Sequence, residues 1–134
     1  MRGCAYVAVT ILILVIAFQL AVAAGLPWGS WTQGGQTGGE LPAAGRAVAL
    51  VSAVILLAFG LAVLARIGRG PMMRVPGRVV AVLAWIAVGY SGLAIVLNGA
   101  SRSSDERLLW LPITVVLFVT ILVAVIGTRH TART

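Results

Sequence analysis

Lysine is absent from this sequence, and cysteine and histidine occur once each, as Cys4 and His130. A lone cysteine cannot form a disulfide within the chain, and neither a CxxC motif nor a Cys/His cluster is present. A zinc or haem site needs several such ligands. A single copy of the chain is therefore not expected to hold a metal or another cofactor.

Charge is also scarce, because 10% of the residues are charged and 60% are hydrophobic, against about 25% and about 45–50% in soluble globular proteins. Uncharged apolar runs cover residues 5–25, 47–65, 79–97 and 108–127. A helix needs about 20 residues to cross a hydrocarbon core of ~30 Å, and each run has about that length. The sequence therefore predicts an all-α fold, a four-helix transmembrane bundle with up-down topology, in which residues 1–134 form a single integral membrane domain.

The ten basic residues are all arginine, which fits a bacterial source with GC-rich genes. With four spans, seven lie on the side of the N-terminus, residues 66–78 and the C-terminal tail, and three lie on the other side. Cytoplasmic loops carry the excess of basic residues. We therefore predict a cell-membrane protein with both termini in the cytoplasm and with loops 26–46 and 98–107 outside. Because the arginines lie in short loops rather than on one basic face, nucleic-acid binding is not expected. The seven are Arg2, Arg66, Arg69, Arg74, Arg78, Arg129 and Arg133, and the three are Arg46, Arg102 and Arg107.

Residues 1–24 allow a second interpretation, a secretory signal peptide. Arg2 precedes an apolar stretch that ends in the small-residue sequence AVAA, which is a plausible cleavage site. The stretch is nearer a full span than the apolar region of about 7–15 residues in a signal peptide, and this favours retention. Cleavage would leave three spans with the same outer loops.

The first loop is rich in glycine and tryptophan and reads GLPWGSWTQGGQTGGELPAAGR with the residue before it. Pro27 is expected to end the first helix, and Trp28 and Trp31 stand where indole rings favour the headgroup region. Two interpretations stay open: an aromatic belt at the membrane surface, or a structured cap with both tryptophans packed over the mouth of the bundle. Glu40 leads into the second helix, and Arg46 lies one turn further along.

The third loop contains a helix-start signal. Ser103 and Glu106 match the S-x-x-E capping box, which accounts for much of this loop without any function. Arginines and carboxylates gathered at one end of a bundle can also form ion pairs, or bind a polar headgroup or an anion. Arg46 could pair in this way with Glu40, Asp105 or Glu106. The polar residues at this end that the capping box does not explain are Glu40, Arg46, Asn98, Arg102 and Arg107.

The polar side chains inside the predicted spans do not ionise at ordinary pH. Proton relays, ion-coupled transport and voltage sensing use ionisable residues within the membrane, so their absence weighs against a proton pump or a voltage sensor. Gln19 and Asn98 lie near the ends of their helices, and we expect each to hydrogen-bond a neighbouring helix. The polar residues of the spans are Gln19, Ser52, Tyr90, Ser91, Thr114 and Thr120.

Two patterns, GLPWG…GG…LP…R and N…SRSSDER..W.P, cover the two outer loops. They resemble a group of uncharacterised small bacterial integral membrane proteins with four spans. In that group a Pro-Trp-Gly loop follows the first helix, and an Asn/Ser/Glu-Arg/Trp/Pro cluster leads into the fourth. The resemblance covers nearly the whole chain and implies the topology but no activity. The matching residues are Pro27, Trp28, Gly29, Gly34, Gly35, Leu41, Pro42, Arg46, Asn98, Ser101, Ser103, Glu106, Arg107, Trp110 and Pro112.

We therefore expect a small polytopic membrane protein, without enzymatic activity, that binds a lipid, a small ligand or a partner protein at its outer face. Its expected partners are the lipid bilayer and either a second copy of the chain or another membrane protein. One alternative is an oligomeric transporter or channel for ions or small solutes. Another is a membrane enzyme that uses the outer carboxylates, although no nucleophile–base pair supports it. The expected binding residues are Trp28, Trp31, Glu40, Arg46, Asn98, Arg102, Glu106, Arg107 and Trp110.

Overall fold

The computed structural model describes the backbone of residues 1–131 and the side chains of residues 1–128. Within that range the chain forms four long α-helices, which confirms the predicted all-α four-helix bundle. Arg129, His130 and Arg133 of the predicted inner tail lie outside the described side chains. The helices are α1 (Arg2–Ala23), α2 (Ala43–Arg66), α3 (Gly77–Ala100) and α4 (Ser104–Thr131), and short 3₁₀ turns are η1 (Gly29–Trp31), η2 (Gln33–Gly35) and η3 (Pro71–Arg74).

The helices extend beyond the apolar runs that predict them, so the loops are shorter than expected. Pro42 and Pro76 immediately precede α2 and α3, where a missing backbone N–H costs nothing because the first turn of a helix leaves its N–H groups unpaired. Arg46 therefore lies in the first turn of α2, and Glu106 and Arg107 lie in the first turn of α4. The predicted loops 26–46 and 98–107 shrink to residues 24–42 and 101–103, because a helix can continue into the headgroup region after the apolar run has ended.

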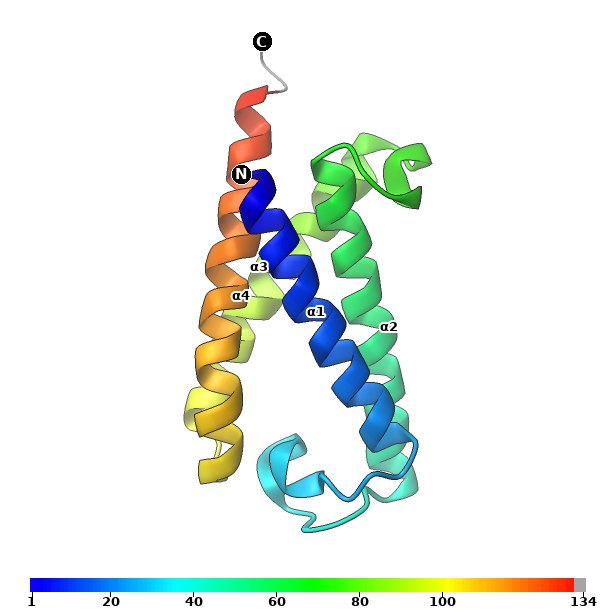
Figure 1. Ribbon diagram of the computed structural model, residues 1–134, viewed down its shortest axis with the longest axis vertical. Helices are drawn as coiled ribbons and strands as arrows, with labels where there is room; N and C mark the ends of the chain where they lie inside the picture. The colour runs from blue at the N-terminus through cyan, green and yellow to red at the C-terminus, as the bar shows by residue number, and fades with distance from the viewer. Residues whose placement is uncertain (132–134) are drawn as a thin grey trace.

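The helices form two pairs that separate toward one end of the bundle. α1 packs most extensively on α2, and α3 on α4. Figure 1 shows α1 and α2 diverging from α4 at the lower end, which we call the cap end. Residues 24–42, which we call the cap segment, fold back into this space and bring η1 and η2 against α4. The N-terminus and residues 67–76 lie at the opposite end.

Most buried side chains lie in the half of the bundle away from the cap segment. Ala5 and Ala8 of α1 are fully buried there, at 0% exposure, and such small residues let helices approach closely. Arg66 of α2 also donates hydrogen bonds to Thr128 Oγ1 (2.9 Å) and to the carbonyl of Val125 (3.2 Å) in α4. The core cluster of this half is Ala5, Ala8, Leu12, Leu56, Phe59, Val63, Ile67, Ala84, Ala87, Val88, Leu117, Ile121, Ala124 and Val125.

The outer faces of the helices are apolar and exposed. Leu14, Val54 and Val96 are 64–67% exposed on three different helices, which would be unfavourable over so large an area in water. All four helices are long and apolar enough to cross a membrane, over the residues that the structure describes. The chain is therefore a multi-pass membrane protein, and the direction in which each helix crosses the bilayer stays a prediction.

Candidate ligand-binding cavity

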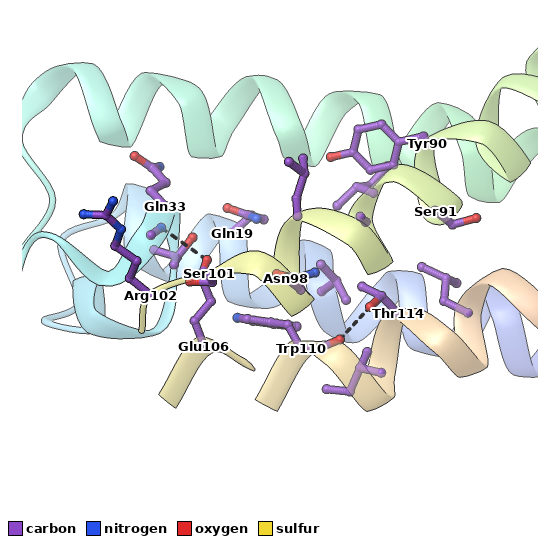
Figure 2. Close-up of a pocket in the computed structure, with 18 of the residues that line it drawn as sticks. Gln19, Gln33, Tyr90, Ser91, Asn98, Ser101, Arg102, Glu106, Trp110 and Thr114 are labelled. Carbon is purple, nitrogen blue, oxygen red and sulfur yellow. Dashed lines mark hydrogen bonds between the residues drawn. The ribbon is translucent and has the colours of Figure 1, made fainter. Parts of the chain in front are cut away.

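A cavity of about 650 Å³ lies at the cap end, between α1, α3, α4 and the cap segment. Small-molecule sites usually have about 300–1,000 Å³, so this one has the size of a binding site. Figure 2 shows side chains from these elements around a common space. α2 contributes one lining residue, Leu56. The lining residues with polar groups are Gln19, Thr32, Gln33, Gln36, Tyr90, Ser91, Asn98, Ser101, Arg102, Glu106, Trp110 and Thr114.

The floor of the cavity is apolar in its chemistry. Leu56 and Leu117 line it and also belong to the core cluster below. Ser91 and Thr114 line it too, but their hydroxyl groups donate to carbonyls of their own helices at 3.0 and 2.8 Å. Those hydroxyls are already hydrogen-bonded. At this level the hydroxyl of Tyr90, the residue before Ser91, stays open to the cavity, and the other open polar groups lie toward the cap segment.

Glu106 joins the first turn of α4 to the cap segment. Its backbone N–H donates to Ser103 Oγ at 3.2 Å, which confirms the first half of the predicted capping box. In the usual second half, the Glu side chain returns to the backbone N–H of the cap residue. Here the carboxylate instead accepts from the backbone N–H of Gly34 (3.3 Å) and from Ser101 Oγ (2.5 Å). A helix-capping residue therefore also holds the loop over the cavity, and Glu106 is 8% exposed as a result.

The cap segment approaches α4 too closely for a side chain at Gly35. A Cβ atom there would lie 2.6 Å from Ser103 Cβ and 2.9 Å from the carbonyl oxygen of Ser30, and the φ angle of Gly35 is +66°. Ser103 Oγ donates to that same carbonyl at 3.1 Å. Next to this glycine, Gln33 has a φ of 51° and its Nε2 donates to the carbonyl of Gly45 at 2.8 Å. The segment is thus fastened at both α2 and α4.

Aromatic rings close the side of the cavity between α1 and α4. Phe18 stacks on Trp28 with centroids 5.8 Å apart, and meets Trp110 edge-on at 4.8 Å. Trp110 Nε1 donates to the carbonyl of Trp31. The ring of Trp28 and the backbone carbonyl of Trp31 are thus held by the bundle, while both indole rings stay partly exposed, at 41% and 37%. The cap segment is therefore structured, and a position of the two rings in the headgroup region stays a prediction.

The structure divides the sequence-predicted binding residues into two groups. Asn98, Arg102, Glu106 and Trp110 line the cavity. The other five do not line it: Trp28, Trp31, Glu40, Arg46 and Arg107.

The arginines near the cavity bond to backbone carbonyls. Arg46 Nε donates to the carbonyl of Ala23 at 2.7 Å, where the sequence suggested a carboxylate as its partner. Arg107 Nη1 donates in the same way to the carbonyl of Ser101. Both bonds satisfy carbonyls at or beyond the end of a helix, so they stabilise chain turns at the cap end.

Gln19 and Asn98 both line the cavity, from α1 and α3. The prediction that each hydrogen-bonds a neighbouring helix is wrong, because neither amide has a hydrogen-bond partner in the described part of the chain, and the same holds for the hydroxyl of Tyr90. No side-chain nitrogen or oxygen there is both fully buried and without a partner. The three groups are therefore reachable from the cavity.

Two contributors to the site could not be found from sequence patterns. Phe18 lies in a run that is apolar on every side, so nothing marks it as the centre of an aromatic cluster. Gln33 is one of several small or polar residues in a glycine-rich loop. A glutamine between glycines is a weak signal for an anchored turn, and it becomes informative only when the neighbouring helix is in place.

Comparison of the chain with protein-family models, with curated proteins and with solved structures finds no match. The assignment of a function therefore depends on the cavity itself. In the residues that the structure describes, no group of three or more His, Cys, Asp or Glu side chains is placed to hold a metal ion. The arrangement offers amides, hydroxyls, a buried carboxylate and an apolar floor, which is a chemistry for recognising an amphipathic molecule.

Proposed function

We propose that this membrane protein binds one small amphipathic molecule of the lipid class in the cavity beneath the cap segment. The observation that carries the proposal is the change in polarity along the cavity wall. The floor presents Leu56, Leu117 and Ile113, while the end beneath the cap segment presents the amides of Gln19 and Asn98. An amphipathic molecule would place its tail against the floor and its head against the amides.

The volume supports a molecule with one chain. The cavity of about 650 Å³ lies within the range of about 300–1,000 Å³ that small-molecule sites have. We therefore propose a ligand with a single chain and a small head.

Two further features favour binding over transport or catalysis. Beyond Leu56 and Leu117 the core cluster fills the other half of the bundle, where Ala5, Ala8 and Ala124 are 0% exposed, so the cavity ends inside the bundle. In addition, the carboxylate of Glu106 already accepts hydrogen bonds on both oxygens. This carboxylate therefore serves to hold the cap segment and not as a free acid or base.

We place the cavity on the outer side of the membrane. The described arginines at the opposite end are Arg2, Arg66, Arg69, Arg74 and Arg78, and basic residues gather on the cytoplasmic side.

Ala94 and Leu93 provide a matched pair of variants for testing this site. Ala94 lines the cavity from α3, whereas Leu93 is 56% exposed on the same helix and does not line it. Ala94→Phe would fill the cavity, and Leu93→Phe would add a ring of the same size outside it. The protein is placed in phosphatidylcholine nanodiscs with three single-chain probes of equal chain length: 1-oleoylglycerol, oleyl phosphate and oleylamine. Native mass spectrometry then measures which probes stay bound.

We expect the wild-type protein and Leu93→Phe to retain at least one probe, and Ala94→Phe to lose it by about tenfold or more. A loss of tenfold corresponds to about 1.4 kcal/mol of binding free energy, which lies within the usual cost of about 1–3 kcal/mol for overfilling a packed space. If Ala94→Phe fails to fold, Ala94→Leu gives a smaller filling for the same measurement. Equal retention of every probe by the filled and control variants would overturn the proposal.

A further inference from the structure

We propose that the head of the bound molecule is uncharged and carries hydroxyl groups, as in a monoacylglycerol or an alkyl glycoside. This inference rests on the proposed function and adds the chemistry of the head. It comes first from the polar groups in the cavity that have no hydrogen-bond partner. It comes also from the two charged residues of the cavity, because Glu106 is already hydrogen-bonded and Arg102 lies at the mouth.

The first observation is the set of unpartnered groups on α1 and α3. The amides of Gln19 and Asn98 and the hydroxyl of Tyr90 line one cavity and have no hydrogen-bond partner in the described part of the chain. Figure 2 shows them around the same space. An amide side chain has both an acceptor oxygen and two donor hydrogens. Polar groups in an apolar medium need partners, and a hydroxyl group, which both donates and accepts, satisfies either end of an amide.

The second observation concerns Glu106, which brings a negative charge to the polar end of the cavity. Its carboxylate is 8% exposed and accepts from Gly34 N–H and Ser101 Oγ. Each oxygen thus already accepts from one neutral donor, which uses two of the carboxylate's roughly four acceptor positions, and an ammonium head is therefore included in the test as the competing chemistry. A phosphate head beside Asn98 would meet this carboxylate in a medium of low dielectric constant, where like charges repel strongly.

The third observation is the position of the other charge, on Arg102. This side chain lines the cavity but is exposed at its mouth, where water screens it. A phosphate could reach it without entering the cavity, so it gives the interior no preference for an anion. The amides of Gln19 and Asn98, which are partly buried, are uncharged, and so is the more exposed hydroxyl of Tyr90. An uncharged hydroxyl head is the chemistry that they match.

The test uses the same nanodiscs, with 1-oleoylglycerol, oleyl glucoside, oleyl phosphate and oleylamine at equal concentration. We expect a hydroxyl-bearing probe to show the highest occupancy in the wild-type protein. If the glycerol probe has a higher occupancy than the glucoside, or the reverse, the result identifies which hydroxyl head is preferred. Either result supports the inference. A phosphate or ammonium probe with the highest occupancy would overturn it.

The double variant Gln19→Leu/Asn98→Leu removes both amides while keeping side chains of similar size. Because two hydrogen bonds are lost, the amount of the hydroxyl probe retained should fall by about tenfold. The control is Thr120→Val, because Thr120 Oγ1 donates to the carbonyl of Val116 in its own helix and does not line the cavity. Its binding should stay within twofold of wild type. Unchanged binding in the double variant would overturn the role of the amides.

The two proposals fail in different ways. If Ala94→Phe does not reduce the binding of any probe, the cavity is not the site and the proposed function fails. If Ala94→Phe blocks binding but the preferred probe is charged, the site stands and the inference about the head is wrong. Thermal melting of each variant is recorded so that loss of fold is separated from loss of binding.

Discussion

Replacing Gly35 with alanine should release the cap segment from α4 while leaving the helices in place. Gly35 is the point of closest approach, because a Cβ atom there would lie 2.6 Å from Ser103 Cβ and 2.7 Å from Ser103 Oγ. These distances are far below ordinary contact, so either Ser103 or the cap segment must move. Ser103 is held by its hydrogen bond to the carbonyl of Ser30 at 3.1 Å, and the movement would break that bond.

The cost can be worked out from two contributions. Gly35 has a φ of +66°, and a residue with a Cβ atom pays about 1–2 kcal/mol in that left-handed region. Loss of the bond between Ser103 and Ser30 adds about 1 kcal/mol. Together they lower the free energy for opening the cap segment by about 2–3 kcal/mol, which increases the open population by about 30- to 150-fold.

Hydrogen exchange measured by mass spectrometry on the peptide of residues 28–36 reports this opening directly. Gly38 provides the matched control, because a Cβ atom there would have nothing within 4 Å and its φ is not in the left-handed region. We expect exchange in Gly35→Ala to be faster by the factor given above, and exchange in Gly38→Ala to stay within about twofold of wild type or to slow slightly. Equal rates in the two variants would refute the reasoning, since both make the same chemical change in the same segment.

Three other predictions concern orientation and the two bonds that frame the cap end. Gly38 and Gly77 both have free space around Cβ, so a cysteine fits at either position. In a Cys4→Ser background, Gly38→Cys should react with a membrane-impermeant maleimide in intact cells and Gly77→Cys only after lysis; the reverse result would place the termini outside. Trp110→Phe keeps an aromatic ring but loses the indole donor to the cap segment, so hydrogen exchange of the cap segment should become about fivefold faster, the equivalent of about 1 kcal/mol. An unchanged exchange rate would mean that the bond is not formed in the membrane. Arg46→Met keeps the unbranched stem of the side chain but removes its bond to the end of α1. Titration with a denaturing detergent should show a loss of about 1.5–3 kcal/mol in the free energy of unfolding, and an unchanged midpoint would contradict the role of that bond.

The number and type of the helices could be predicted because one physical requirement dominates. Backbone groups in lipid must bond within their own segment, so an uncharged apolar run of sufficient length has to be a helix. The same run does not mark where the helix ends. Residues 43–46 and 104–107 continue α2 and α4 outward because helix geometry, and not hydropathy, sets the last hydrogen bond. Arg46 therefore lies inside α2, whereas Glu106 lies in the first turn of α4 as its capping box predicts.

The candidate site could be predicted only as far as its end of the bundle. Asn98, Glu106 and Trp110 were found because chemically distinctive residues at helix ends on one side of a membrane must be neighbours. Their orientation was not accessible, since a helix that is apolar all round gives no periodic signal for which face is buried. For that reason Gln19 was expected to bond a neighbouring helix, although it faces a cavity.

The capping box shows how a correct local explanation can still be incomplete. Ser103 and Glu106 do start α4 as their spacing predicts, and nothing further is needed to explain why they are there. Yet the hydroxyl of Ser103 also donates to Ser30, and the carboxylate of Glu106 receives Gly34. Because the same two side chains fix the helix start and the cap segment, the first turn of α4 and the ceiling of the cavity cannot move independently. A bound molecule that shifts the cap segment would therefore be felt at the start of α4, and a stable α4 in turn keeps the cavity closed above its ligand.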